Sequence, residues 1–568
     1  MRPTLGAVMR TLGFLFLAVL GCTARPTGPQ PLRADVCVYG ATAAGVVAAI
    51  QAARQGNSVV LLDPDGWIGG LTTSGLGATD VGNKDAIGGI AREFYRRLRT
   101  HYDTPGSWTR EDPARFRGRG HAKGDDAAWT FEPSVAQREL GAMLASEKVD
   151  VRRAERLDRT VPKGAVLANG VELEGRAIRS IRMESGLAVE ARMFVDCTYE
   201  GDLMAAAGVS FTVGREPNSR HGETLNGVQV GNAKHHQFLV DVDPYVLPGD
   251  PASGLLPGIE PGPLPADGTG DAKLQAFCYR ICATDDPDNR VPWPKPEGYD
   301  PRDHELLLRW FDAGATMAPW HPVLLPNRKT DSNNNGAVST DHIGANWNWP
   351  EASHAERARI AAEHKRHNLG LLWTLANNER VPAKVRAEFQ RYGLARDEFV
   401  EHGNWPPLLY VREGRRLVGE SVITEQHCTG AQAVADPVGM GAYAMDSHNV
   451  QRYVDANGRV RNEGDVQVRV PRPYGIGYGA LVPKRGECSN LLVPVACSAS
   501  HIAYGSIRME PVFMVLAQSA VVAAGIALEH GTAVQDVPYS LLRERLLQLG
   551  QVLEWRGAPK ATAPAPKG

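Results

Sequence analysis

A glycine-rich turn near the start of the chain constrains the fold more than any other feature. Asp35–Tyr39 is an apolar run, and the turn Gly40-Ala41-Thr42-Ala43-Ala44-Gly45 follows it directly. The Ala-rich segment Ala43–Gln55 then predicts a helix, and the apolar run Ser58–Leu62 predicts a second strand. A strand, a glycine turn, a helix and another strand within about 30 residues form a βαβ unit. The sequence therefore predicts an α/β protein built on a parallel sheet.

The residues of this turn suit the chemistry of a dinucleotide. Gly40 permits a tight turn, Gly45 lets the helix pack closely on the strand, and the free N–H groups around Ala44 can face a pyrophosphate. Thr42 replaces the middle glycine of the usual pattern, and its hydroxyl is a candidate phosphate donor. Asp63 lies 23 residues after Gly40, where a carboxylate can bind a ribose hydroxyl. A helix start that only packs is the alternative, but strand, helix and acid together favour dinucleotide binding.

Other patterns extend this unit along the chain. Pro133–Glu147 predicts a helix, Val149–Val151 a third parallel strand, and Ala165–Phe194 an antiparallel meander that returns to the sheet. Near the end of the chain, Asn490–Val495 predicts a strand and Pro511–Glu529 an apolar helix. These elements predict a Rossmann-like domain with a parallel sheet and an antiparallel meander.

The middle of the chain differs from both flanks in composition. It holds much of the proline, most of the tryptophan and one clear helical pattern, Ser353–Asn377. We therefore expect residues 213–405 to form an inserted α+β substrate or cap domain, between the two parts of the Rossmann-like domain, 33–212 and 406–551. The Ala/Pro/Lys-rich end, residues 552–568, is expected to be a disordered tail.

The first residues predict a targeting segment. The apolar run Leu12–Leu20 follows a short positive region and is too short to span a bilayer as a helix. Val19-Leu20-Gly21-Cys22 resembles the bacterial lipoprotein cleavage box, in which Cys22 becomes the lipidated first residue, and an ordinary signal peptide is the alternative. We expect a signal peptide over 1–22, a Pro-rich linker over 23–32, and an exported protein that is periplasmic or anchored to the bacterial membrane.

Charge and ligand patterns exclude two classes of partner. The formal net charge is -2 and there is no long basic run, which argues against a nucleic-acid partner. Seven cysteines follow Cys22, so at least one thiol should stay unpaired, and no CxxC pair predicts a metal site. Asp331–Gly336 fits the first half of a calcium loop, but His342 stands where the twelfth position needs a carboxylate. A polar turn at a substrate pocket is the preferred interpretation, with no metal.

A second chemical signal precedes the apolar C-terminal helix. The segment Ser498–Arg508 is followed by Pro511, which suits the first turn of a helix. The partial positive charge at that helix start could stabilise the electron-rich edge of a reduced flavin, and Arg508 could add to the same field. An ordinary buried helix after a polar loop is the alternative interpretation.

Several motifs together make the chain resemble the FAD-dependent oxidoreductase family of the glutathione-reductase-type flavoprotein superfamily, whose bacterial members are often labelled xanthan lyases. The matching segments span almost the whole mature length. They are Gly40–Gly45, Asp63, Gly69–Gly75, Asp196–Leu203, Lys329–Gly336, Tyr410–Glu413, Asp446–Asn449 and His501–Arg508.

This resemblance implies FAD as the cofactor. The pyrophosphate is expected on the first turn and the adenosine ribose on Asp63. The pair Gly201-Asp202 resembles a flavin-side motif in which backbone and carboxylate meet the cofactor. The further residues expected to bind FAD are Gly69, Gly70, Thr198, Gly505, Ser506 and Arg508.

Histidines are the natural proton carriers for such a site, since their charge can change near neutral pH. We expect His501 to be a substrate-facing acid or base, and for His448 a catalytic and a structural role both stay open. His364 and His367 are expected to be solvated. A run of arginines could bind an anionic substrate or belong to a salt-bridged surface strand. They are Arg412, Arg415 and Arg416.

The expected activity is hydride transfer from a substrate C–H to flavin N5, with an unknown electron acceptor. A carbohydrate or glycoside is the preferred substrate, from the export signal and the Trp/Asn-rich insertion. Trp320, Trp347, Trp349 and Trp405 could stack on a sugar, although packing suits most of them better. A polysaccharide lyase that uses bound flavin and a non-catalytic flavin- or glycan-binding lipoprotein are the two alternatives.

Overall fold

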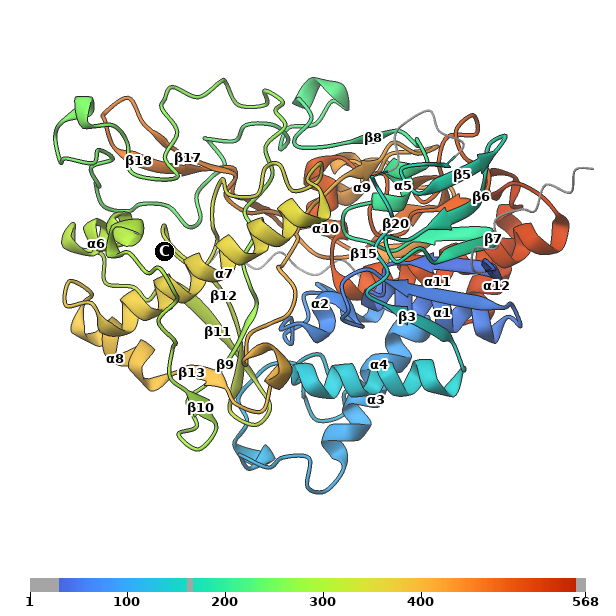
Figure 1. The fold of residues 1–568 in the computed structure, drawn as a ribbon, viewed down its shortest axis with the longest axis horizontal. Helices are drawn as coiled ribbons and strands as arrows, with labels where there is room; N and C mark the ends of the chain where they lie inside the picture. The colour runs from blue at the N-terminus through green and yellow to red at the C-terminus, as the bar shows by residue number, and fades with distance from the viewer. Residues whose placement is uncertain (1–29, 161–166, 558–568) are drawn as a thin grey trace, which may run out of the picture.

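The computed structural model describes residues 30–160 and 167–557, and these form two lobes (Figure 1). The expected signal peptide, lipidation at Cys22 and most of the linker lie outside the described residues, so they stay predictions. Leu553 is buried in the main core, so residues 552–557 are not part of a disordered tail. Residues 558–568 also lie outside the described residues.

An eight-stranded sheet forms the centre of the first lobe. Its strands are β1 Leu32–Tyr39, β2 Val59–Asp63, β3 Asp150–Arg153, β4 Leu167–Ala168, β5 Val171–Glu174, β6 Ala177–Arg182, β7 Ala188–Asp196 and β21 Leu491–Leu492. The order is β3-β2-β1-β7-β6-β5-β4, and β21 pairs with the end of β7. Strands β1, β2, β3, β7 and β21 are parallel, whereas β4 to β7 form an antiparallel meander. The predicted Rossmann-like sheet with its meander is confirmed.

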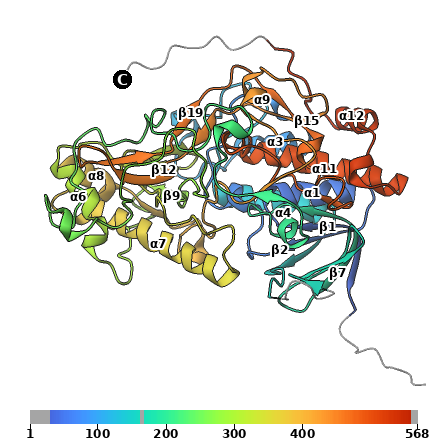
Figure 2. The ribbon, with the colours of Figure 1, turned by 90° about the horizontal axis from the view of Figure 1, so that it is seen from above.

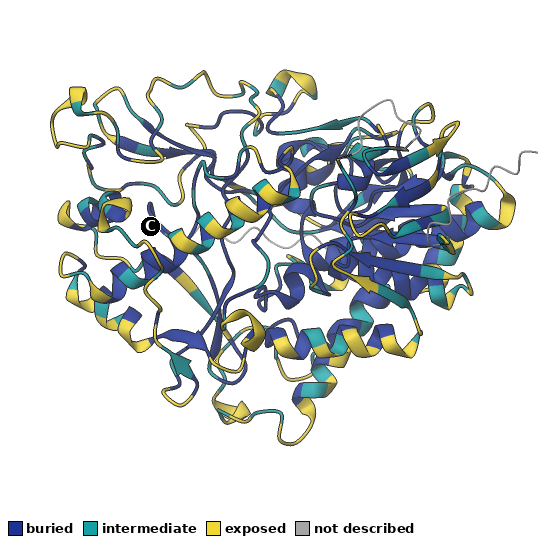
Figure 3. Cartoon of the chain, viewed as in Figure 1, coloured by how far each residue is buried: buried dark blue, intermediate teal, exposed yellow. Residues whose placement is uncertain are grey.

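Both faces of the parallel strands are covered, which explains their continuous apolar sequence. On one face, Val36, Val38 and Leu61 pack in the same core as a layer of helices. On the other face, Cys37 and Leu62 pack against the meander. The central strands are buried along most of their length (Figure 3). The helical layer consists of α1 Ala43–Arg54, α3 Gly89–Asp103, α4 Pro133–Ser146 and α11 Glu510–His530.

The two ends of the chain meet in this helical layer, where α1 packs along α11 (Figure 2). The side chain of Gln518 on α11 donates to Gln51 on α1 at 2.9 Å. Helix α11 is the one helix of the described residues long and apolar enough to cross a membrane, yet 94% of its most apolar window is buried inside the protein. It is therefore a core helix, and the predicted helix Pro511–Glu529 is confirmed.

The second lobe is built around a five-stranded antiparallel sheet. Its strands are β9 Ile281–Thr284, β10 Arg290–Val291, β11 Trp320–Leu325, β12 Lys329–Asn334 and β13 Gly393–Ala395, in the order β10-β13-β9-β12-β11. Three helices accompany the sheet: α6 Glu305–Asp312, α7 His354–Asn377 and α8 Ala383–Arg391. The predicted helix Ser353–Asn377 is confirmed as α7, and the lobe is α+β as expected.

The chain leaves and re-enters the first lobe side by side. Strand β8, Phe211–Thr212, pairs with β14, Arg416–Leu417, in an antiparallel ladder. One hairpin after the insertion, β17 Gln451–Val454 with β18 Val460–Glu463, lies against the second lobe, where Arg452 donates to the carbonyl of Ala337 at 3.0 Å. Part of the stretch 406–551 therefore belongs beside the inserted domain.

The segment Asp331–Gly336 is not the polar turn that its composition predicts. Its first residues belong to β12, which pairs with β9 on one side and β11 on the other. Asp331 is fully buried and accepts two hydrogen bonds of 2.7 Å from Arg280. Local propensity disfavours Asp and Asn in a strand, but the buried ion pair and the two ladders outweigh it.

Shorter elements complete the fold. The helices are α2 Gly70–Thr73, α5 Asp202–Ala206, α9 Glu425–Thr429, α10 His501–Ile507 and α12 Tyr539–Gln548. The strand pairs are β15 Pro437–Gly441 with β20 Tyr474–Gly477, and β16 Met445–Ser447 with β19 Val466–Val468. Single 3₁₀ turns are η1 Lys84–Ala86, η2 Pro113–Arg115, η3 Asn218–Arg220, η4 Pro251–Ser253, η5 Pro301–His304, η6 Val400–His402, η7 Tyr478–Ala480 and η8 Val534–Asp536.

Candidate functional site

The glycine turn brings α1 against the end of β1 with no space for side chains. A Cβ on Gly45 would lie 1.8 Å from the carbonyl oxygen of Gly40. Gly40 has a φ of +101°, and a Cβ there would lie 2.7 Å from the amide nitrogen of Thr198. Thr42 caps α1, since its hydroxyl accepts from the Gly45 N–H and donates to the carbonyl of Cys197 at 2.9 Å. The N–H of Ala44, in the first turn, has no acceptor within the helix and is free for an anion.

Two further segments close around this turn. Gly70, at the start of α2, has a φ of +56°, and a Cβ on it would lie 2.4 Å from the hydroxyl of Tyr199 and 2.9 Å from Cα of Thr42. Gly69 precedes it and donates its N–H to the carbonyl of Ala41 at 2.8 Å. The ends of β1, β2 and β7 thus converge on one point, as the carboxyl edge of a parallel sheet does in nucleotide-binding folds.

The loop after β7 is held by its own side chains. The hydroxyl of Thr198 donates to Asp196 at 2.7 Å and accepts from the N–H of Gly201 at 3.0 Å. Gly201 has a φ of +65°, which suits glycine at this sharp entry into α5. The predicted residues Thr198 and Gly201 therefore lie beside the glycine turn.

Asp63 ends β2 with a carboxylate that is only partly used. The side chain is 1% exposed, and its Oδ1 accepts from the N–H of Asp65 at 3.1 Å. Its Oδ2 is buried and has no hydrogen-bond partner among the described residues. Burial raises the pKa of Asp63 above its ordinary value. A buried acceptor without a partner is costly, so this oxygen fits a hydroxyl that a ligand would supply.

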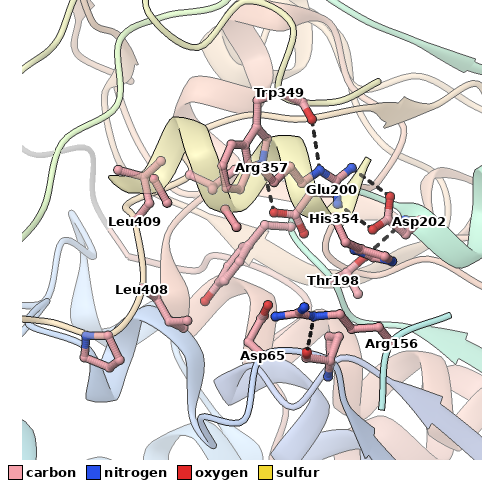
Figure 4. A pocket seen from close by; sticks show the side chains of 16 residues that line it. Asp65, Arg156, Thr198, Glu200, Asp202, Trp349, His354, Arg357, Leu408 and Leu409 are labelled. Carbon is pink, nitrogen blue, oxygen red and sulfur yellow. Dashed lines mark hydrogen bonds and ion pairs between the residues drawn. The ribbon is translucent and has the colours of Figure 1, made fainter. Parts of the chain in front are cut away.

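A cavity of 190 Å³ opens beside the end of β2 (Figure 4). The first lobe contributes residues after β2, β3 and β7, and the second lobe contributes Trp349 and the first turns of α7. In Figure 4, Asp65 and Arg156 lie on the side opposite Trp349 and Arg357. Trp349 donates to Glu200 at 3.0 Å across the join between the lobes. The cavity therefore exists only where both lobes meet.

The start of α11 faces a second, much smaller cavity. Its volume is about 10 Å³, enough for roughly one water molecule. Arg508 lines it and donates to Asp446 at 3.2 Å and to the hydroxyl of Tyr410 at 3.2 Å. Glu510, the first residue of α11, lines it as well. The remaining lining residues are Thr72, Leu76, Thr79, Asp80, Tyr95, Phe131 and Met509.

Comparison with protein families decides the assignment. The profile of the FAD dependent oxidoreductase family matches residues 35–546, which is most of the chain. The protein belongs to this family. It is an FAD-dependent oxidoreductase, as the sequence motifs predict, and FAD is its cofactor.

Solved structures give only partial likenesses, and none of the curated proteins matches the chain. The L-amino acid deaminase from Proteus vulgaris is 18% identical over 34% of this chain and 53% of its own, with a TM-score of 0.21. The thioredoxin reductase of T. acidophilum is 18% identical over 29% of this chain and 34% of its own, with a TM-score of 0.17. The 3-ketosteroid-delta4-(5alpha)-dehydrogenase from Rhodococcus jostii RHA1 is 18% identical over 30% of this chain and 47% of its own, with a TM-score of 0.19. The chain matches about a third to a half of the length of these structures, and likenesses this low say nothing about the substrate.

The site of the FAD-dependent oxidoreductase fits its cofactor. The glycine turn is a cradle that any Cβ would fill, and its helix start presents N–H groups of the kind that bind a pyrophosphate. The buried Oδ2 of Asp63 lacks a partner where a ribose hydroxyl is expected. The larger cavity continues from Pro64 and Asp65, directly after that carboxylate.

Asp202, predicted to meet the cofactor, lines the larger cavity and also anchors the two lobes to each other. Its carboxylate accepts from Arg357 on α7 at 2.6 and 2.9 Å and from Arg415 at 2.9 Å, and Arg159 lies 3.4 Å away. Burial alone would raise the pKa of Asp202, but these guanidinium groups, Arg357 foremost, hold it well below its usual range. Its oxygens are therefore taken by arginines of this chain.

His501, expected to be an acid or base, lines neither of the two cavities described above. Its Nδ1 lies 2.9 Å from the carboxylate of Glu413, its Nε2 lies 3.1 Å from the hydroxyl of Ser447, and the residue is 2% exposed. Burial, with the nearby Arg416, lowers the pKa of His501 to about 3. Both ring nitrogens are engaged inside the fold, so the structure favours a structural role.

His448 is closer to the second cavity. Its Nδ1 lies 2.8 Å from Asp341, and its Nε2 lies 3.8 Å from Asp446, the carboxylate that also holds Arg508. Burial and the neighbouring Arg412 lower the pKa of His448. Of the two predicted histidines, only this one is linked to a residue of the α11 start.

Gly505 and Ser506 serve packing in this structure. A Cβ on Gly505 would lie 2.5 Å from the carbonyl oxygen of Asp446, so α10 rests directly on β16. The hydroxyl of Ser506 accepts from Tyr474 at 2.8 Å and donates to the carbonyl of Tyr443 at 2.6 Å. Arg508 is the member of this predicted group that lines a cavity.

The other side chains singled out in the sequence are buried in the core or form ion pairs. Arg412, Arg415 and Arg416 pair with buried carboxylates, as the salt-bridge interpretation predicts, but they are themselves buried and do not lie on a surface strand. His364 is fully buried rather than solvated, because α7 packs it inside the second lobe. Of the four tryptophans, three are buried and Trp347 is half-buried, as packing predicts. Within the described residues, no group of three or more His, Cys, Asp or Glu side chains could hold a metal ion.

Sequence reasoning missed Glu510 at the start of α11 and the two residues that donate to it. Tyr199 donates its hydroxyl to Glu510 at 2.8 Å and accepts from the N–H of Leu71 at 3.0 Å. The hydroxyl of Thr72 donates to the other oxygen of Glu510 at 2.7 Å. The sequence offers one signal for this group, which is that Glu510 is an acid at the first position of an apolar helix, directly before Pro511.

Proposed function

We propose that this FAD-dependent oxidoreductase oxidises a hydroxylated small molecule of the carbohydrate class, with hydride transfer from a substrate C–H to the flavin. The supporting observation is the polar part of the wall of the small cavity at the start of α11. The cavity has room for about one water molecule as it stands, so binding of a sugar requires it to widen. Hydroxyl, carboxylate and guanidinium groups converge there. They come from Thr72, Thr79, Asp80, Tyr410 and Arg508.

The proposal places the two ends of FAD on the two regions already described. The pyrophosphate lies on the turn of Gly40, Thr42, Ala44 and Gly45, beside Gly69, Gly70, Thr198 and Gly201. The adenosine ribose binds Asp63, whose Oδ2 is free to accept. The ring end lies toward the start of α11, where Arg508 and the helix N-terminus supply positive potential.

Oxidation of a carbinol moves a hydride and a proton in different directions. FAD, when bound, supplies the hydride acceptor. The chain must hold the carbinol so that its C–H faces the ring, and must take up the hydroxyl proton. Asp80 and the hydroxyls of Thr72 and Thr79 are suited to hydrogen-bond a polyol, since a sugar offers a donor and an acceptor at each hydroxyl. The guanidinium group of Arg508 pairs with Asp446, and this ion pair holds Arg508 in a fixed orientation at the cavity wall.

A direct test combines absorbance with substrate screening. We expect the purified protein to show flavin absorbance, and we expect anaerobic addition of an oxidisable sugar to bleach it. A derivative of the same sugar with its hydroxyls methylated is the matched control, since it has no hydroxyl proton to lose. Bleaching by amino acids or steroids but by no sugar would contradict the carbohydrate class. Unsaturated sugar products without bleaching would favour the lyase alternative instead.

A further inference from the structure

Glu510 occupies an unusual place for a carboxylate. It is the first residue of the apolar helix α11 and only 4% exposed. The hydroxyl of Thr72 donates to its Oε2 at 2.7 Å, and the hydroxyl of Tyr199 donates to its Oε1 at 2.8 Å. These donors come from α2 and from the loop after β7, so three separate segments fix this carboxyl group at the wall of the second cavity.

Among the described residues no Lys, Arg or His forms an ion pair with Glu510, although Arg508 lines the same cavity. Two buried carboxylates of the second lobe, by contrast, are paired with arginines: Asp331 with Arg280 at 2.7 Å and Asp341 with Arg412 at 3.0 Å. A buried carboxylate without a cation is costly to keep ionised, so such a group changes its protonation state more readily than a paired one.

The groups around Glu510 set how it titrates. Tyr95 on α3, Tyr199, Tyr410, Asp80 and Arg508 are the titratable groups of the elements that surround it. Burial raises the pKa of Glu510 to about 7, and the hydrogen bonds from Thr72 and Tyr199 oppose that rise. Both protonation states are therefore accessible near neutral pH, which is the condition for efficient general acid–base catalysis.

We propose that Glu510 is the catalytic base that takes the hydroxyl proton of the substrate while the carbon gives its hydride to the bound flavin. The inference rests on the proposed function. The substrate O–H and C–H bonds break, a C=O bond forms, the proton stays on the Glu510 carboxylate and the electron pair leaves with the hydride. The acid then returns its proton to solvent when the product leaves.

A titration of the FAD-loaded protein tests the proposal without any substrate. The absorbance of bound flavin is followed from about pH 5 to about pH 9, a span that brackets an ionisation close to neutrality. We expect one transition near pH 7 in the natural protein, since a carboxyl group beside the ring alters its spectrum when it loses its proton. Glu510→Gln should remove the transition, because the amide does not titrate.

Two further variants control this result. Glu529→Gln makes the same change at the other end of α11, on an exposed ion pair with Arg545, and should keep the transition. Tyr199→Phe removes a donor to the carboxylate, so it should move the transition to higher pH. A transition that persists in Glu510→Gln, or that Tyr199→Phe leaves in place, would overturn the proposal, as would its absence from the natural protein. If Glu510→Gln does not fold, the Tyr199→Phe shift alone decides.

The substrate screen separates this inference from the proposed function. If no sugar bleaches the flavin, the carbohydrate class fails, whereas the titration still reports whether Glu510 ionises beside the ring. With an oxidisable sugar in hand, Glu510→Gln should slow flavin reduction by about 10² to 10⁴-fold and flatten its pH profile around neutrality. Unchanged reduction by that sugar would show that another group takes the proton.

Discussion

Gly45 allows no side chain, and this single position tests the predicted phosphate cradle. A Cβ there would lie 1.8 Å from the carbonyl oxygen of Gly40, so Gly45→Ala must push α1 away from β1. We expect it to lower the free energy of unfolding by about 1–3 kcal/mol and to abolish FAD binding. Denaturant unfolding and the flavin absorbance of the purified variant measure the two effects.

Gly141 provides the matched control for this substitution. It lies inside α4, is exposed, and a Cβ on it would meet no atom within 4 Å. Gly141→Ala should therefore stabilise the protein by about 0.5–1 kcal/mol and leave FAD in place, since glycine is costly inside a helix. If Gly45→Ala kept its flavin, the pyrophosphate could not lie on this turn.

Separation along the chain explains which residues of the candidate site could be predicted from the sequence. Gly40, Gly45 and Asp63 were predictable, because the turn, the helix start and the end of the next strand lie close together in sequence. Glu510 was not, because its two donors, Thr72 and Tyr199, are 438 and 311 residues away. The contacts of His501 were not predictable for a related reason. Its partner Glu413 is 88 residues away, and no local pattern shows that the ring is already engaged.

At the scale of elements, α7 carries two members of a histidine cluster. The rings of His342 and His367 stack with centroids 3.9 Å apart, and His364 lies 5.0 Å from His342. His304 joins the cluster at 5.6 Å from His367. Burial lowers the pKa of His304 and His364 to about 4 and holds the pKa values of His342 and His367 well below their ordinary value. The cluster is therefore neutral in the folded protein.

This cluster predicts how stability depends on pH. The folded pKa values lie below the unfolded value of about 6.5, so the unfolded chain binds more protons. The contribution of the cluster to the free energy of unfolding is therefore fully present above about pH 6.5 and is lost as the pH falls toward about 4. A histidine as buried as His364 contributes a loss of about 2 kcal/mol by about pH 5. Denaturant unfolding at neutral and acidic pH measures the slope, and His364→Gln should reduce it.

An exposed histidine in the same lobe is the control. His321 lies on β11 with its side chain in solvent, so His321→Gln should leave most of the acid loss in place. An equal slope in the natural protein and in His364→Gln would show that the cluster does not govern the acid response.

The elements themselves were predicted with uneven success. Helices and strands with a clear apolar pattern, such as α1, α4, α7 and α11, follow from the sequence alone. Strand β12 does not, because its Asp and Asn residues read locally as a turn. Its place between β9 and β11 depends on Arg280, which lies on another segment and neutralises Asp331. Strand β12 forms because of its pairing with β9 and β11 and its ion pair with Arg280, and none of these contacts can be read from the local sequence.

For the whole molecule, the contact between Asp202 and Arg357 joins the two lobes beside the larger cavity. Arg357→Ala would leave the buried carboxylate with Arg159 and Arg415 alone. We expect a loss of about 3–5 kcal/mol in unfolding free energy and faster release of FAD, since one wall of the cavity comes from α7. Unfolding curves and the recovery of flavin fluorescence on dilution measure these effects.

Arg366→Ala is the matched control on the same helix. Arg366 is exposed and pairs with Asp303 at the surface, so its removal should change stability by at most about 1 kcal/mol. FAD release as slow in Arg357→Ala as in Arg366→Ala would show that α7 does not retain the cofactor.

The packing of α1 along α11 also sets an order of assembly during synthesis. The ribosome makes the glycine turn early, but the helix that covers α1 is made only with residues 510–530. Until then the nascent polypeptide has the glycine turn without the helix that covers α1, and an apolar face of α1 stays exposed. A chain cut short before that helix would lack the cover of α1, so we expect stable binding of FAD only once the whole polypeptide has been made.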